Sequence, residues 1–175
     1  MKPEQEEAFA DFVATRSAAV RRLALAVTGD WHRADDLAQD VFVKLYLAWP
    51  LREPGAGDVW LRTTLVRTWI DETRRPWRRH ERTAESVPET VAPATPSGEA
   101  AAVVGVLRRL PPRQRACLVL RFLEDWSVEQ TAQALRCSTG TVKSQTSRAL
   151  DAIRAMPPVV LSALGPARDE DGRTR

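Results

Sequence analysis

Hydrophobic residues recur along this chain at intervals of three and four positions, the spacing of one face of an α-helix. In the first third of the sequence this pattern predicts a helix that ends at Gly29, a second over 33–48, and a third that begins near Asp58 and ends before Pro76. Asp58 is expected to cap the third helix, because its short side chain can accept hydrogen bonds from free N–H groups. Residues 50–58 hold two clusters of proline or glycine and are expected to form a loop. The apolar row of the second helix is Ala34, Leu37, Ala38, Val41 and Leu45.

The helical pattern returns in the second half of the chain. Further helices are expected over 99–110, 113–123, 127–135 and 139–154. Ser127 precedes Gln130 by three positions at the start of the third of these, and this spacing is typical of a capping box. The buried row of the last helix is expected to be Val142, Thr146, Ala149, Leu150 and Ile153. No segment shows the alternation of a β-strand, so we expect an all-α fold.

A change of composition divides the chain into two helical regions. Residues 81–98 contain three prolines, several Ser, Thr and Glu residues and almost no large apolar side chain. Such a segment cannot bury enough surface to fold alone, which predicts a flexible, acidic, proline-rich linker. We therefore expect two small helical domains, over 1–80 and 99–156, and a disordered tail over 157–175.

Charge and rare residue types add constraints. The net charge is +3, and of the 26 basic residues only Lys2, Lys44 and Lys143 are lysines. Arginine suits bidentate contacts with phosphate and guanine, although a GC-rich coding sequence would give the same bias. Cys117 and Cys137 fall in apolar helical patterns and the two histidines lie beside neither, which predicts no disulfide framework, no metal site and no cofactor. A polar, acidic N-terminus and the lack of an apolar run of ~20 residues predict a soluble, cytoplasmic protein without a membrane span.

The last two predicted helices, joined by a tight turn, are typical of a helix-turn-helix. In such a unit the N-terminal half of the second helix enters the major groove of DNA. Opposite its apolar row this helix carries donors suited to phosphates and base edges, and Thr141 lies at its start, where backbone N–H groups can also meet a phosphate. These donors are Lys143, Ser144, Ser147 and Arg148. The alternative is an ordinary solvated helix face.

The second predicted helix carries an acidic face. Asp36 and Asp40 stand four positions apart, with Gln39 between them, opposite the apolar row. Such a face could bind a basic partner helix. The alternative is that Asp36, in the first turn, only stabilises the helix through its dipole.

Arginines and tryptophans interleave over residues 60–79. They are Trp60, Arg62, Arg67, Trp69, Arg74, Arg75, Trp77, Arg78 and Arg79. Single-stranded DNA is held by cationic grooves together with aromatic stacking, so this segment is a candidate for binding it. For a single tryptophan, packing in the core is the alternative role, with the exception of Trp77, which lies beyond Pro76.

Taken in order, these segments resemble the extracytoplasmic-function, or group IV, sigma factors of RNA polymerase over about residues 5–155. The motifs LPPRQR at 110–115, LRF at 120–122, SVEQTA at 127–132 and CSTGTVKS at 137–144 are similar to the fourth conserved region of that family. DDLAQDVF at 35–42 is similar to the polymerase-binding helix of the second region, and WLR at 60–62 with IDETRR at 70–75 to its promoter-melting helix. The spacing of the two halves resembles the SigE-like subfamily.

The resemblance implies a role for each group of candidate residues. Asp36, Gln39 and Asp40 would bind the clamp helices of the largest polymerase subunit. The upstream promoter element would contact Thr141, Lys143, Ser144, Ser147 and Arg148. The downstream promoter element would contact Trp60, Arg62, Arg67, Asp71, Arg74, Arg75 and Arg78. The acidic linker would either occupy the nucleic-acid path of polymerase as an RNA mimic or serve only as a spacer.

Two positions depart from the family's pattern. Arg67 stands where many members carry asparagine, and Gln145 stands where many carry arginine. Both departures leave open which bases are read.

The implied function is that of a sigma factor, which is not an enzyme by itself. It would bind core RNA polymerase and promoter DNA and direct promoter-specific initiation of DNA-templated transcription, with an anti-sigma factor as a candidate partner. The alternative function is that of a helix-turn-helix transcriptional regulator with an N-terminal sensing domain. Binding to core polymerase would separate the two, because a simple regulator does not need it.

Overall fold

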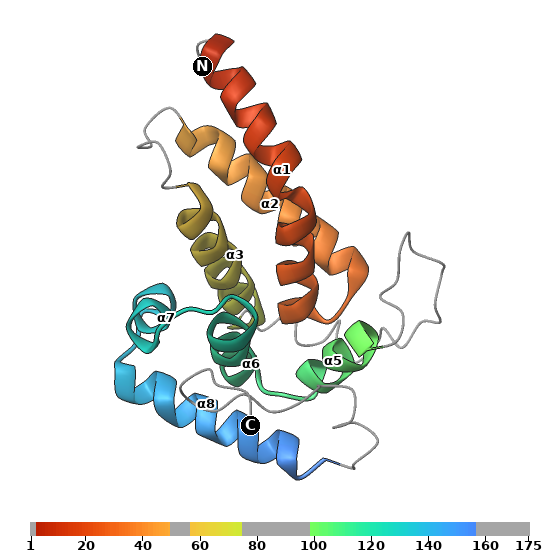
Figure 1. Cartoon of the computed structure of the whole chain (residues 1–175), viewed down its shortest axis with the longest axis vertical. Helices are drawn as coiled ribbons and strands as arrows, with labels where there is room; N and C mark the ends of the chain where they lie inside the picture. Colours follow the sequence, from red (N-terminus) through yellow and green to blue (C-terminus); the bar gives the residue numbers. More distant parts are fainter. Residues whose placement is uncertain (1–2, 50–56, 75–98, 157–175) are drawn as a thin grey trace. The chain divides into compact units, whose positions relative to one another are not determined.

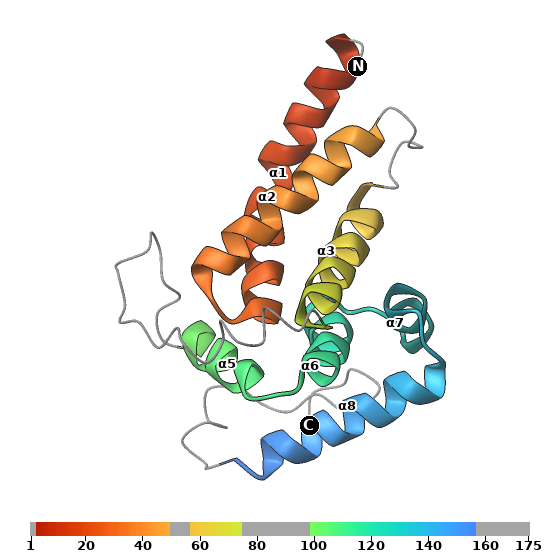
Figure 2. The same cartoon turned by 180° about the vertical axis from the view of Figure 1, so that it is seen from behind.

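The computed structural model describes residues 3–49, 57–74 and 99–156 of the 175-residue chain. All regular elements in these ranges are helical, which confirms the predicted all-α fold (Figures 1 and 2). The chain divides into two compact units, Met1–Thr83 and Ala84–Arg175, and each is described by itself. The predicted linker over 81–98 and the predicted tail over 157–175 lie outside the described residues.

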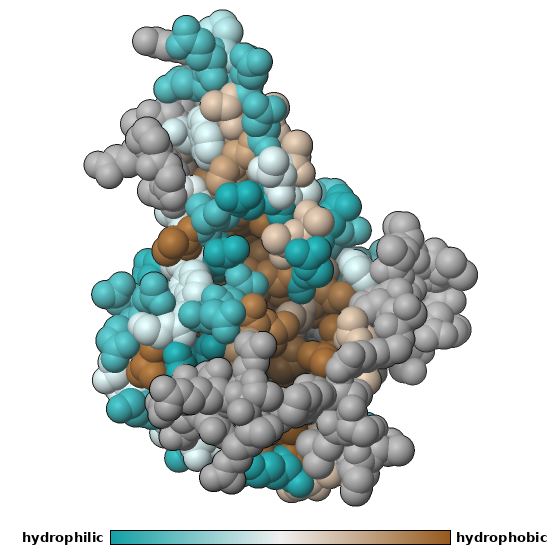
Figure 3. Space-filling model, in the orientation of Figure 1, coloured by the Kyte–Doolittle hydropathy of each residue, from teal (hydrophilic) through white to brown (hydrophobic). Residues whose placement is uncertain are grey.

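The described residues of the first unit form three helices: α1 (Pro3–Thr28), α2 (Trp31–Ala48) and α3 (Gly57–Arg74). Each helix packs against the other two. The predicted apolar row of α2 is confirmed, because all five of its residues are buried. The amino-terminal half of α1 carries mostly exposed, hydrophilic side chains on its outer face (Figure 3).

The turn between α1 and α2 forms from local signals. Gly29 adopts φ 73°, and its N–H donates to Leu25 O at 2.7 Å, which confirms the predicted left-handed end of α1. Asp30 then caps α2, because its side chain accepts a hydrogen bond from Arg33 N at 2.9 Å. As a result α2 begins at Trp31, earlier than the predicted start near residue 33.

The start of α3 is fixed by contacts with α1. A Cβ atom at Gly57 would lie 3.0 Å from two ring atoms of Phe12, so a side chain at this position would require the ring to shift by a few tenths of an ångström. The prediction that Asp58 caps α3 is wrong: the helix begins at Gly57, and Asp58 lies within its first turn. The Asp58 carboxylate instead accepts hydrogen bonds from Arg16 Nε, at 2.8 and 3.0 Å.

The second unit contains α5 (Glu99–Arg108), α6 (Pro112–Leu118), the π-helical turn η2 (Val119–Leu123), α7 (Val128–Leu135) and α8 (Thr139–Arg154). The helix predicted over 113–123 is thus divided into α6 and η2. The wider turn ends where Glu124 N donates to Val119 O and Trp126 N donates to Leu120 O, which brings the Trp126 side chain into the core.

Buried contacts connect the helices of this unit. Arg115 donates hydrogen bonds to the carbonyl oxygens of Arg108, at 2.8 Å, and Leu110, at 3.1 Å, and so closes the turn between α5 and α6. Helix α8 packs against α6 and α7. One core cluster contains Cys117 of α6, Ala132 of α7 and Val142 of α8, which joins the three helices.

Candidate functional site

Helices α7 and α8 begin with local capping interactions. The predicted capping box is confirmed: Ser127 Oγ accepts from Gln130 N at 3.1 Å, and Gln130 Oε1 accepts from Ser127 N at 2.7 Å. Ser138 caps α8 by accepting from Thr141 N at 3.1 Å. The two helices therefore form the two parts of a helix-turn-helix, joined by the turn over 136–138.

Helix α8 separates its core face from its polar face. Val142, Thr146, Ala149 and Ile153 are buried, and Leu150 is half-buried. The predicted donors Lys143, Ser144, Ser147 and Arg148 lie together on the opposite face and are all exposed. Among the described residues neither Lys143 nor Arg148 forms an ion pair within 4.0 Å, so both cations are available to a ligand. Thr141 is half-buried, and its hydroxyl lies 2.9 Å from Ser138 Oγ.

Two acidic residues that the sequence analysis did not single out limit this basic surface. Asp151 lies four positions after Ser147 on the exposed face and pairs with Arg154 at 3.0 Å. Glu129 lies in the first turn of α7. A hydrogen bond from its own backbone N–H, and then from Ser127, lowers the pKa of Glu129, and the charge of Lys143 acts in the same direction. The face suited to phosphates therefore ends before Asp151, and Glu129 borders it near Lys143.

The turn before α8 holds an unusual backbone conformation. Arg136 adopts φ 51° and ψ 52°, the left-handed region. For a side chain of this kind the conformation costs about 1–2 kcal/mol. A cation at the C-terminus of α7 returns about 0.3–1 kcal/mol through the helix dipole.

Helix α3 distributes its candidate residues over two sides. Residues at positions 60, 64, 67, 71 and 74 follow the spacing of one helical face. Trp60, Arg67, Asp71 and Arg74 are on this face; the first two are half-buried and the last two exposed. Trp69 is only 1% exposed, which agrees with a core role. Arg75, Trp77, Arg78 and Arg79 lie outside the described residues.

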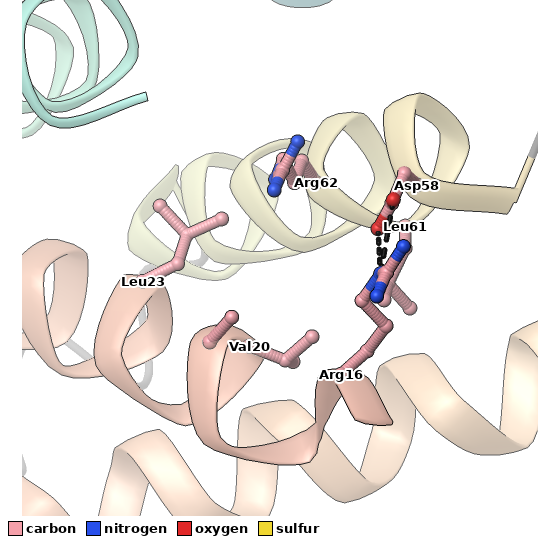
Figure 4. A pocket seen from close by; sticks show the side chains of 7 residues that line it. Arg16, Val20, Leu23, Asp58, Leu61 and Arg62 are labelled. Atoms are coloured by element: carbon pink, nitrogen blue, oxygen red, sulfur yellow. Dashed lines mark hydrogen bonds and ion pairs between the residues drawn. The ribbon is translucent and has the colours of Figure 1, made fainter. Parts of the chain in front are cut away.

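Arg62 lies on the other side of α3, toward α1. With Arg16, Asp58 and Leu61 it lines a small pocket between the two helices (Figure 4). The hydrogen bond from Arg16 to Asp58, and the negative charge of Asp58, raise the pKa of Arg16. Arg62 is therefore not brought together with Arg67 and the other candidates on the exposed face.

Helix α2 presents a face with acidic and apolar parts. Asp36, Gln39 and Asp40 are exposed on it, as the sequence predicts. The same face continues through Val43, which is 59% exposed, and Leu47, which is 72% exposed. These two residues were not among those predicted from the sequence, although both are apolar and both lie off the buried row of α2.

Other polar and aromatic side chains of α2 form contacts within the first unit. Asp35, next to Asp36, pairs with Arg21 of α1 at 3.2 Å. Lys44 donates to Thr68 Oγ1 of α3 at 2.9 Å. Tyr46 packs edge-on against the Phe9 ring, with 5.3 Å between the ring centres.

The cysteines behave as packing residues. Cys117 is buried, as predicted, and burial raises the pKa of its thiol to about 12. Cys137 is half-buried and packs against the same cluster. In the ranges that the structure describes, no group of three or more His, Cys, Asp or Glu residues could hold a metal ion. No helix of those ranges is long and apolar enough to cross a membrane.

Comparisons with known proteins agree with this arrangement. Residues 12–79 match the family model for sigma-70 region 2, and residues 100–153 match that for sigma-70 region 4. The RNA polymerase sigma-E factor of Streptomyces coelicolor is 36% identical over 154 residues, which cover 83% of this chain and 84% of that protein. The sigma-E factor of Streptomyces avermitilis is 33% identical, with 83% of each chain covered.

Two solved structures share the fold. The sigma factor RpoE of Bartonella quintana, solved in complex with the anti-sigma factor NepR, aligns with a TM-score of 0.68 at 24% identity, covering 89% of this chain and 98% of that one. CnrH, solved in complex with the cytosolic domain of CnrY, aligns with a TM-score of 0.60 at 23% identity, covering 86% of this chain and 87% of that one.

Proposed function

The chain belongs to the extracytoplasmic-function sigma factors of RNA polymerase, and we propose that three outward helix faces divide the work of promoter recognition. As a sigma factor it binds core polymerase and directs it to promoters. In the proposal, α2 docks on core polymerase, α3 holds the opened downstream element, and α8 reads the upstream element. The observation that carries the proposal is that the candidate residues on α2 and α8, apart from the half-buried Thr141, are exposed opposite the buried rows of their helices.

The proposed polymerase contact uses both parts of the α2 face. Asp36 and Asp40 offer carboxylates, and Gln39 offers an amide, to a basic partner helix. Val43 and Leu47 add an apolar continuation, which would give the contact a part that salt does not screen. Binding should therefore weaken with salt and still persist at moderate ionic strength.

A double charge reversal tests this contact. Asp36→Arg with Asp40→Arg should abolish association with core polymerase, because like charges placed in an interface cost several kcal/mol. The measurement is co-purification with core enzyme, with helical content checked by circular dichroism. Glu7→Arg with Asp11→Arg is the matched control, since these exposed acids have the same spacing on α1. Retention of core enzyme by the α2 variant at moderate salt would move the contact elsewhere.

The α3 face combines an aromatic ring, cations and one acid. Trp60 could stack on a base while Arg67 and Arg74 contact the backbone, a combination suited to single-stranded DNA. Arg75 and Arg78 remain part of this proposal through the family resemblance. Arg62 is proposed as a weaker participant, because it lines the pocket toward α1.

Paired substitutions separate the two sides of α3. Arg67→Ala should slow promoter opening about tenfold, as expected when a contact of ~1.4 kcal/mol is lost. Arg62→Ala should leave opening nearly unchanged and instead lower the melting temperature of the protein. Permanganate reactivity of unpaired thymines measures opening. An equal loss for both variants would contradict the division of α3 into two sides.

The proposal extends to organisation and regulation. We propose a polymerase-binding and melting domain over 1–80, an upstream-element domain over 99–156, and a linker over 81–98. The chain is proposed to have no catalysis of its own and to act in the cytoplasm, where bacterial polymerase is found. RpoE and CnrH were solved with NepR and CnrY, which supports an anti-sigma factor as a regulator of this chain too. A regulator with a sensing domain is disfavoured, because residues 12–79 match region 2.

A further inference from the structure

The turn between α7 and α8 contains a residue type that the fold does not require. Among the described residues, Asp125 and Arg136 are the non-glycine residues with positive φ, at 53° and 51°. Aspartate visits this region fairly readily, whereas arginine does not. The backbone N–H of Arg136 bonds to the carbonyl oxygens of Ala132 and Gln133, and a glycine would make the same bonds without the steric cost.

The side chain of Arg136 contributes little to the stability of the folded protein. It is exposed, and it forms no ion pair within 4.0 Å among the described residues. Its favourable interaction with the end of α7 is smaller than the cost of the left-handed conformation. Backbone strain that no nearby interaction offsets is typical of functional positions.

The location of Arg136 suggests what it binds. The residue lies three positions before Thr139, the first residue of α8, so it flanks the end of α8 that carries Lys143. The turn that contains it leads directly into α8 (Figure 2). The acid on the exposed face of α8, Asp151, lies at the opposite end of that helix. Arg136 thus adds a third exposed cation to the helix-turn-helix, after Lys143 and Arg148.

We propose that Arg136 binds a backbone phosphate of the upstream promoter duplex, beside the major groove that α8 enters. This inference rests on the proposed role of α8. A planar guanidinium can donate two parallel hydrogen bonds to a phosphate, and from a turn it can reach the strand that borders the groove. The contact carries no base preference, so it positions α8 and strengthens binding to every sequence alike.

The test uses the full chain in complex with core polymerase. Arg136→Gly removes the cation and relieves the backbone, so stability and DNA binding should move in opposite directions. Its melting temperature should be equal to or above that of the unaltered protein. Its affinity for duplexes selected from random sequence by the unaltered holoenzyme should fall about three- to tenfold at low salt. A salt series should give a slope shallower by about 0.9 for the one lost phosphate contact.

Three further variants make each outcome decisive. Arg136→Asn keeps a residue that tolerates this backbone conformation and should bind DNA as weakly as the glycine variant. Asp125→Gly relieves the same conformation at the other end of α7 and should leave affinity unchanged. Lys143→Ala tests the underlying role of α8. If both Arg136 variants bind with normal affinity while Lys143→Ala binds more weakly, the proposed phosphate contact of Arg136 is wrong and the role of α8 stands. If the two Arg136 variants and Lys143→Ala all bind with normal affinity, the proposed role of α8 is wrong as well. A loss confined to one base pair would also overturn the phosphate contact.

Discussion

Helices α3 and α8 are both proposed to contact promoter DNA, but they begin in different ways. The start of α8 is set locally, because Ser138 caps the helix by accepting a hydrogen bond from Thr141 N, three positions later. The start of α3 is set by contacts with α1, because Gly57 lies against the Phe12 ring and Asp58 pairs with Arg16. A helix that begins through a local cap keeps its whole outer face for a ligand, whereas α3 uses part of its circumference to pack on α1.

This difference explains why the candidate residues of the two helices are distributed differently. On α8 the four exposed donors lie on one face, opposite the buried row. On α3 the ring of Trp60 is half-buried, Trp69 belongs to the core, and Arg62 lines the pocket toward α1. We infer that α8 is built as a preformed surface for duplex DNA, and that α3 contributes a narrower stripe to DNA that has already been opened.

Substitutions on α8 should change promoter binding more than substitutions elsewhere in the chain. Lys143→Ala or Arg148→Ala should each weaken binding to the upstream element by ~1–3 kcal/mol if the side chain reads a base. A phosphate contact would instead weaken all sequences alike and reduce the salt dependence. Competition binding with single base-pair changes distinguishes the two. Unchanged promoter output in both variants would remove α8 from the upstream contact.

The features that the sequence predicts correctly are those that depend on neighbouring residues. The helix-turn-helix, its capping box and the exposed donors of α8 were all predicted correctly, because their signals lie within a few residues of one another. The predicted apolar row of α2 is also confirmed, because the burial of one helix face follows from the spacing of apolar residues in the sequence.

Features that depend on distant contacts were not predictable in this way. Asp58 has the side chain of a good N-cap, and only the position of Arg16, 42 residues earlier, decides that it pairs instead. Helical spacing already places Arg62 and Arg67 on different sides of α3, but only the position of α1 shows that Arg62 lines a pocket. The division of the 113–123 helix into α6 and η2 likewise depends on Trp126 folding back into the core.

A smaller effect is expected at the start of α3. Gly57→Ala should lower the free energy of unfolding by about 1–2 kcal/mol, because overpacking costs more than the gain in helix propensity. The Phe12 ring cannot easily move away, since Trp49 packs on it with 5.1 Å between the ring centres and Arg16 lies 5.6 Å above it. Urea unfolding of the full chain measures the change. A stabilised variant would show that the start of α3 tolerates local variation as α8 does.

The smallest change in the free energy of unfolding is expected at Gly140, the glycine in the first turn of α8. Its sign should be opposite to that expected for Gly57→Ala. Gly140 is exposed in the first turn, and a Cβ atom there would meet only Ser138 Oγ, at an ordinary 3.8 Å. Gly140→Ala should therefore raise the free energy of unfolding by about 0.5–1 kcal/mol. It should also weaken upstream-element binding several-fold, because Gly140 shares the face of Ser144 and a methyl group would keep the DNA backbone at a distance. Gly105→Ala on α5 is the control: a Cβ atom there meets nothing within 4 Å, so it should give the same stabilisation without loss of DNA affinity. Equal DNA affinity for the two alanine variants would mean that the first turn of α8 does not approach the promoter closely.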